Sequence, residues 1–351
     1  MTVRKKIAVI LASHGEAETP GFIENYRVSL QTLSHASEVM RIPVPLQHLI
    51  SLSSSFRKRF RAVPGAGGSP QNSLTRSQAA LLQQHLDRHS ASSGIDFDVR
   101  AAHSASVPYV EQVLAGTSGH DGQVVVPMAP VDNALSCGLI CAHLASSLPA
   151  DKLHRVKVVG RLWSDDGLIR AYLDHLFASG RRLPERAGRR NLLMLTFHGT
   201  LVRDRNGMEP GFRTGREETA AFARRLIAAI EADPRNPWGM VTAAYLNHDV
   251  GGEWTQPSFE EATRTLADEG HDGVWLFAAG YFSDGNETLH RAAQLAGAVE
   301  GLRVEAIPCL NDSPGFAEYL AGRVAGAAAQ ILRFSGDGVP DAALLTEEAI
   351  L

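Results

Sequence analysis

Cysteine is scarce in this chain, which has three among 351 residues. That number gives no disulfide framework and is typical of a reducing compartment, so we expect a cytoplasmic protein. Cys137 and Cys141 are four residues apart and would share a helical face, but with only Cys309 to add, one chain cannot complete a four-thiolate site. We therefore expect no Fe–S cluster and no tightly bound cofactor, and we interpret the cysteines as small buried apolar residues.

Long apolar runs are also missing. No segment approaches the roughly 20 apolar residues that a membrane-spanning helix needs. The start, "MTVRKKIAVILASHGE", has a short apolar run that breaks at Ser13-His14-Gly15. It is more typical of a first β-strand than of a signal peptide. Transient contact with a membrane surface stays open.

Neither charge sign dominates, since 34 Lys and Arg residues face 38 Asp and Glu residues and the formal net charge is -4. This balance argues against a general nucleic-acid-binding protein, which would show a basic excess. The local basic stretch Arg57–Arg61 has two interpretations: a solvated helix end, or a contact for an anion such as a propionate.

Several catalytic motifs are absent, including GxSxG and HExxH. The glycine-rich "PGAGGSPQN" at 64–72 lacks the lysine of a phosphate-binding loop and follows no predicted strand. We expect it to form a loop over a pocket, with Asn72 or Ser73 capping the next helix.

What the chain does contain is a regular alternation of short apolar runs and helical patterns. The predicted strands are Ile7–Ala12, Phe97–Ala102, Val124–Met128, Val156–Gly160, Leu192–Phe197, Met240–Ala244, Val274–Ala279 and Val304–Ile307. The clearest predicted helices are Thr75–His89, Glu217–Ala232, Ser258–Glu269 and Glu287–Val299. Continuous apolar strands separated by helices predict an α/β fold with doubly wound parallel sheets.

Two similar halves are indicated, because the chain is long for one core and two of its segments open alike. "AVILASHGEAETP" and "LLMLTFHGTLVRD" both run from an apolar strand through His-Gly into a polar loop, and the polar stretch "SGRRLPERAGRRN" separates them. We predict an N-terminal half at 1–180, a C-terminal half at 190–333 facing it across a cleft, and a tail at 334–351.

Ionisable residues gather where predicted strands end, which is where open parallel sheets bind ligands. His14 and His198 end two strands, and "AAGYFSDGNETLH" places Asp284, Glu287 and His290 around a helix start, with Glu287 and His290 on one face. Each has a structural alternative: a strand-end histidine can be satisfied and inert, and a carboxylate can interact with a helix dipole. Their gathering at one edge favours a site.

Four motifs in order, "GGSPQNSLTRSQA", "FHG", "GYFSDGNETLH" and "PCLNDSP", resemble those of ferrochelatases over about residues 6–330. These enzymes insert ferrous iron into a porphyrin. The resemblance implies a chelatase-like fold of two Rossmann-like halves, each with a parallel four-stranded sheet, around a porphyrin cleft. It also implies porphyrin (protoporphyrin IX or coproporphyrin III) and Fe²⁺ as partners, with the protein a monomer or homodimer.

Carried over by position, His198 and Glu287 are the implied catalytic pair and metal contacts, and His14 is a further metal contact. Insertion of a dication expels two pyrrole protons, which a histidine near neutrality and a carboxylate can accept. Porphyrin contacts are expected from Ser69, Tyr26, Phe56 and Trp254. For Tyr26 and Phe56, which lie at helical spacing, the alternative to a porphyrin contact is a position in the hydrophobic core.

Some segments depart from the family pattern. The first strand ends in "ASHGEAETP", where a His-Gly is more reminiscent of the small chelatases that act on sirohydrochlorin; "AYLNHDVGGEW" replaces a Gln-Ser-basic motif, and "APVDNALSCG" is also altered. Two alternatives to a ferrochelatase therefore stay open. One is a chelatase for another tetrapyrrole or metal, such as sirohydrochlorin with cobalt or nickel. The other is a non-catalytic tetrapyrrole- or metal-binding protein.

Overall fold

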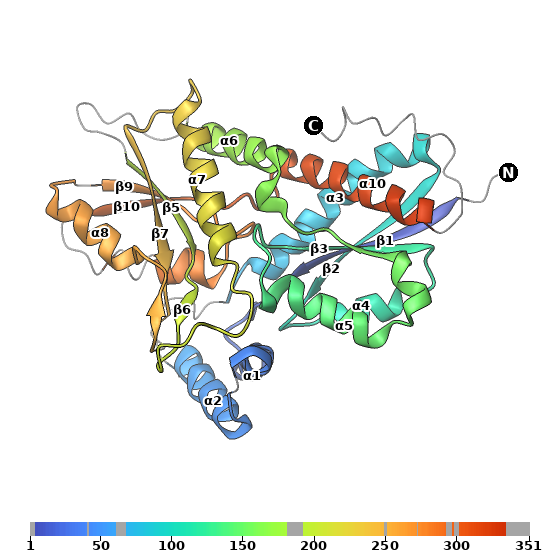
Figure 1. Cartoon of the computed structure of the whole chain (residues 1–351), viewed down its shortest axis with the longest axis horizontal. Helices are drawn as coiled ribbons and strands as arrows, with labels where there is room; N and C mark the ends of the chain where they lie inside the picture. Colours follow the sequence, from blue (N-terminus) through green and yellow to red (C-terminus); the bar gives the residue numbers. More distant parts are fainter. Residues whose placement is uncertain are drawn as a thin grey trace.

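Two parallel four-stranded sheets form the centre of the molecule (Figure 1). The computed structural model describes residues 4–40, 42–60, 68–180, 192–248, 251–271, 273–292, 297 and 302–334. The first sheet has the order β2-β1-β3-β4, and the second has the order β10-β9-β5-β7. The strands of these two sheets are β1 (Lys5–Ser13), β2 (Ile95–His103), β3 (Gly122–Pro127), β4 (Val156–Val158), β5 (Leu192–His198), β7 (Met240–Leu246), β9 (Gly273–Phe277) and β10 (Arg303–Ile307). A separate antiparallel sheet pairs β6 (Leu201–Arg203) with β8 (Glu253–Trp254). All eight predicted strands and the predicted α/β class are confirmed.

Helices lie on both sides of the sheets, which is why the central strands contain continuous apolar runs such as Ile7–Ala12 and Val124–Val126 (Figure 1). The α-helices are α1 (Phe22–Met40), α2 (Val44–Phe60), α3 (Gln71–Ser93), α4 (Val110–Gly116), α5 (Leu139–Ser147), α6 (Asp166–Gly180), α7 (Arg216–Ala232), α8 (Phe259–Asp268) and α10 (Pro314–Phe334). The described residues also form two π-helices, η1 (Ala134–Gly138) and η4 (Asn286–Arg291), and two 3₁₀-helices, η2 (Ala150–Arg155) and η3 (Leu162–Ser164). In the described part of the chain, no helix combines the length and apolarity needed to span a bilayer.

The start of α3 differs from the prediction. The residue before its first turn is Pro70, and no side chain caps the helix. Asn72 lies inside the first turn, and its amide bonds both backbone groups of Glu16, at 2.9 Å and 2.8 Å. Ser73 donates to the Pro70 carbonyl instead of capping. The preceding loop at 61–67 lies outside the described residues.

One hydrophobic core spans both sheets, because the same cluster of buried side chains includes Leu11 of β1 and Leu195 of β5. Helix α10 follows the second sheet in sequence but packs against α3, α6 and β3 of the first half. Tyr172 of α6 reaches the second half, where its hydroxyl donates to the Ala279 carbonyl at 2.8 Å. The predicted boundary at 181–189 lies outside the described residues. Of the tail predicted at 334–351, Phe334 is the last residue of α10, and 335–351 lie outside the described residues.

Replacing Tyr172 by Phe tests this connection between the halves. The variant keeps the ring, which packs edge-on against Phe222 and Phe277, but leaves the buried carbonyl without its donor. We expect a loss of about 1–2 kcal/mol in the free energy of unfolding, measured by urea denaturation.

Tyr245→Phe is the matched control, since Tyr245 lies in the same core and its hydroxyl has no hydrogen-bond partner among the described residues. A change below about 0.5 kcal/mol is expected there. Equal losses in the two variants would contradict a specific role for the Tyr172 hydroxyl.

Candidate functional site

His198 is the last residue of β5 and emerges from the core. The six residues before it are buried, whereas half of its side-chain surface is exposed. β5 pairs with β7 in parallel register, His198 opposite Leu246, so the two strands end together. A Cβ on the next residue, Gly199, would lie 2.8 Å from both the Leu246 carbonyl oxygen and the Asn247 Cα. Glycine is therefore required for the close approach of the two strand ends.

His248 lies beside His198, two residues beyond the end of β7. Their Nε2 atoms are 3.1 Å apart. The Asn247 amide donates to the Thr255 carbonyl at 2.8 Å and so anchors the loop. The ring of Trp254, in the short strand β8 (Glu253–Trp254), packs edge-on against His248 with ring centres 5.6 Å apart. Trp254, a predicted porphyrin contact, thus lies at the site.

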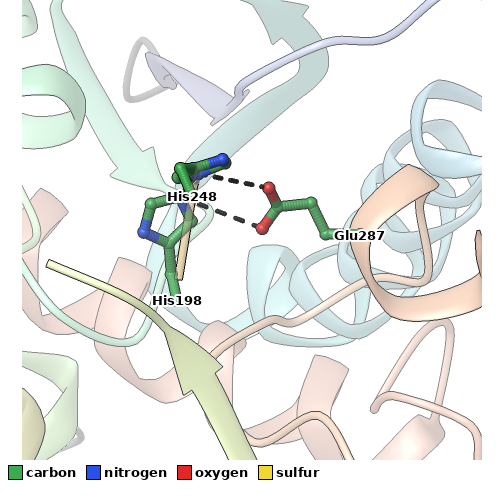
Figure 2. Close-up of side chains that lie close together, drawn as sticks. All are labelled: His198, His248 and Glu287. Atoms are coloured by element: carbon green, nitrogen blue, oxygen red, sulfur yellow. Dashed lines mark hydrogen bonds and ion pairs between the residues drawn. The ribbon is translucent and has the colours of Figure 1, made fainter. Parts of the chain in front are cut away.

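Glu287 of η4 completes the cluster (Figure 2). Its Oε1 is 3.5 Å from His248 Nε2, and its Oε2 is 3.9 Å from His198 Nε2. Oε2 also accepts a short hydrogen bond from the Tyr281 hydroxyl. The ligand atoms of His198, His248 and Glu287 lie within 4.8 Å of one another, and the described residues contain no other trio of this kind.

The surroundings of Glu287 favour its ionised form. Burial acts to raise the pKa of this carboxyl, but His198, His248, the Tyr281 hydroxyl and the Arg291 guanidinium outweigh that effect and lower it. Burial and the adjacent carboxylate raise the pKa of Tyr281 well above its usual value. Tyr281 therefore stays protonated and donates to a charged Glu287.

The prediction that Glu287 and His290 share a helical face is wrong. The segment forms a π-helix, whose wider turn places residues four or five apart on one face. Arg291 is consequently the residue that reaches the site, with its Nη1 3.4 Å from His248 Nδ1. Asp284 has a structural role, because it is buried and accepts a hydrogen bond from the Asn311 amide at 2.7 Å.

His14 follows the end of β1 and lies near the same cluster. Its Nε2 is 3.3 Å from the Thr32 hydroxyl of α1. The ring is accessible to solvent, but protein surrounds it on most sides, so loss of hydration lowers its pKa. The carboxylates of Glu16 and Glu287 partly offset this effect, whereas His198 adds to it. His14 thus shares the electrostatic environment of the other two predicted site residues.

Ser69 is buried in a junction between the halves. Its hydroxyl donates to Glu16 Oε2, which also accepts from the Asn286 backbone N–H at 3.0 Å. Glu16 therefore ties the loop after β1 to the helix that carries Glu287. The Ser69 hydroxyl is already bonded, and its predicted contact with a porphyrin stays a prediction.

Tyr26 and Phe56 lie on the α1–α2 pair. The Tyr26 hydroxyl bonds His48 Nδ1 at 2.6 Å. Phe56 is 54% exposed and packs on Phe60, so the alternative of a core position is wrong for it. Helix α2 in fact buries polar residues and exposes an apolar stripe. The buried residues are Gln47, Ser51 and Ser55, and the stripe comprises Leu49, Leu52, Phe56 and Phe60.

The prediction that the three cysteines are small buried residues is confirmed only in part. Cys309 is buried, Cys137 is partly buried and Cys141 is exposed. The Sγ atoms of Cys137 and Cys141 are 3.8 Å apart, which confirms the shared face. Burial, with smaller effects of Cys141 and Asp132, raises the pKa of Cys137 to about 12, so this thiol is poorly suited to act as a thiolate ligand.

Sequence reasoning missed His248. The predicted strand ended at Ala244, which put His248 four residues into a loop, whereas β7 continues to Leu246. The signal available in the sequence was the segment "AYLNHDVGGEW", which contains His248 and stands where the family pattern has a Gln-Ser-basic motif. An imidazole just past a strand end is a metal-ligand type at the ligand-binding edge of a parallel sheet.

Known proteins resemble this chain along nearly its whole length. A ferrochelatase from Neisseria meningitidis serogroup C is 25% identical over 334 residues, covering 91% of this chain and 93% of the relative. A ferrochelatase from Escherichia coli O45:K1 is 26% identical over 340 residues, covering 91% and 98%.

Among solved structures, SirB from Bacillus subtilis with Fe³⁺ is 13% identical with a TM-score of 0.46, covering 95% of this chain and 100% of that one. The family model described as Ferrochelatase matches residues 6–328. The chain therefore belongs to the ferrochelatase family.

Proposed function

We propose that this protein is a tetrapyrrole metal chelatase that inserts Fe²⁺ into a porphyrin, protoporphyrin IX or coproporphyrin III, and releases two protons. The observation that carries the proposal is the meeting of His198 and Glu287 at one sheet edge, with a half-exposed imidazole 3.9 Å from an ionised carboxylate. Membership of the ferrochelatase family supports the class of reaction.

The pair suits proton removal. When a dication enters the macrocycle, two pyrrole N–H bonds break and their electron pairs bind the metal. The His198 imidazole can accept one proton at a time, and Glu287 stabilises the resulting imidazolium. Solvent at the exposed ring then takes the protons away. The reaction needs no tightly bound cofactor, since the metal ion is itself a substrate.

Other features suit a large apolar ligand that carries carboxylates. The apolar stripe of α2 and the indole of Trp254 offer surface for a macrocycle. Lys58, near the end of α2, is half-buried; loss of hydration lowers its pKa, and Glu16 partly offsets this. Lys58 is thus a cation near Glu16, which is bonded to the start of the helix that carries Glu287. This position supports the interpretation of the basic stretch as a propionate contact.

A second candidate is a chelatase for another tetrapyrrole or metal, such as sirohydrochlorin with cobalt or nickel. His14 favours it, because this imidazole shares the environment of His198 and Glu287. The third candidate, a non-catalytic binding protein, would not need a proton acceptor at the site.

His198→Ala tests the proposed proton acceptor. We expect the metallation rate to fall roughly 10²–10⁴-fold because the more exposed of the two neighbouring imidazoles is lost, while porphyrin binding persists. The rate is followed as the porphyrin absorbance shifts to that of the metalloporphyrin, with Fe²⁺ under anaerobic conditions or with Zn²⁺. His154→Ala, at an exposed histidine of η2, is the control. A near-normal rate in His198→Ala would remove this residue from the mechanism.

A metallation panel separates the three candidate functions. Protoporphyrin, coproporphyrin and sirohydrochlorin are each offered with Fe²⁺, Co²⁺ and Ni²⁺, and we expect the fastest turnover with a porphyrin and Fe²⁺. His14→Ala should change the ratio of rates between metals. Metallation of sirohydrochlorin alone would support the second candidate, and binding of porphyrin without any metallation would support the third.

A further inference from the structure

The three side chains at the sheet edge present their ligand atoms to one point. His198 Nε2 and His248 Nε2 are 3.1 Å apart, and Glu287 supplies Oε1 and Oε2 at 3.5 Å and 3.9 Å from them (Figure 2). We propose that His248 completes, with His198 and Glu287, a three-ligand site that binds one divalent first-row metal ion before the tetrapyrrole arrives. This inference rests on the proposed function and specifies how its metal substrate is selected.

The spacing fits a single ion. Ligand atoms about 2.1 Å from a metal lie about 3.0 Å apart at a right angle and about 3.4 Å apart at a tetrahedral angle. The distance between the two Nε2 atoms, 3.1 Å, and the distance from His248 Nε2 to Glu287 Oε1, 3.5 Å, match these separations. The distance from His198 Nε2 to Glu287 Oε2, 3.9 Å, must shorten by about half an ångström or more for both atoms to bind one ion. Three protein ligands leave the remaining coordination positions of the metal open for water or for the incoming pyrrole nitrogens.

The donor types select the metal. Two imidazoles with one carboxylate suit Fe²⁺, Co²⁺, Ni²⁺ and Zn²⁺, whereas Mg²⁺ and Ca²⁺ prefer sites made entirely of oxygen. His198 and Glu287 alone would offer one nitrogen and one carboxylate. His248 is therefore the residue that makes the site nitrogen-rich and raises its preference for the later metals.

The surroundings of His248 limit how tightly the ion is held. Arg291 can only donate, so its contact with His248 Nδ1 at 3.4 Å favours the tautomer with the ring proton on Nε2, the atom 3.1 Å from His198 Nε2. A metal at Nε2 requires that proton to move to Nδ1, where it faces the guanidinium. The positive charge of Arg291 also opposes a dication. Both effects keep the ion transferable to a macrocycle.

Co²⁺ titration of the full chain without tetrapyrrole tests the site, followed by the visible absorption of bound cobalt and by calorimetry. We expect one Co²⁺ per chain, no binding of Mg²⁺ at the same concentrations, and at least tenfold weaker Co²⁺ binding in His248→Ala. His248→Gln, which keeps more of the side-chain volume, should show the same loss. Arg291→Gln should tighten binding severalfold.

His271→Ala is the matched control. His271 Nε2 lies 3.7 Å from Glu269 Oε2, a histidine–carboxylate pair at similar spacing that belongs to no trio of ligands among the described residues. Its loss should leave Co²⁺ affinity unchanged. Wild-type affinity in both His248 variants would overturn the inference.

The metallation panel keeps this inference separate from the proposed function. Normal metallation together with unchanged Co²⁺ affinity in the His248 variants refutes the three-ligand site alone. Tenfold weaker Co²⁺ binding in those variants, in a protein that metallates no tetrapyrrole, supports the three-ligand site and refutes the proposed function.

Discussion

A carboxylate largely withdrawn from water needs partners, and much of this structure serves to supply them to Glu287. Its neighbours are two imidazoles, a tyrosine hydroxyl and a nearby guanidinium. His198 and His248 come from the ends of two adjacent parallel strands, which coincide because the register places His198 opposite Leu246. A Cβ at Gly280 would lie 2.9 Å from the Phe197 Cα, so glycine is needed there for the loop after β9 to bring Tyr281 to the carboxylate.

Residues of the first half of the chain also help to position Glu287. Glu16, just after β1, accepts the Asn286 N–H and so fixes the start of the π-helix that carries Glu287. Tyr172 joins the halves through the core. The site therefore depends on the packing of both sheets, although the three residues of the proposed metal site all belong to the second half of the chain.

The sequence predicted every strand of the two sheets, because strands covered on both faces are continuously apolar and easily recognised. The sequence also predicted that His198 and Glu287 lie at the same edge of a parallel sheet. His248 was missed because β7 continues two residues beyond the predicted strand end. Arg291 was missed because a π-helix changes which residues share a face. The outward apolar stripe of α2 escaped prediction because amphipathic spacing does not indicate which face is buried.

The central claim is that metal is delivered to the tetrapyrrole from the edge where His198, His248 and Glu287 meet. Anomalous diffraction at the cobalt absorption edge, from crystals of the full chain loaded with Co²⁺, tests it most directly. The account predicts one strong peak about 2.1 Å from both histidine Nε2 atoms and from a Glu287 oxygen. A strong peak elsewhere, at His14 or the Cys137–Cys141 pair, with no density between the three side chains, would contradict it.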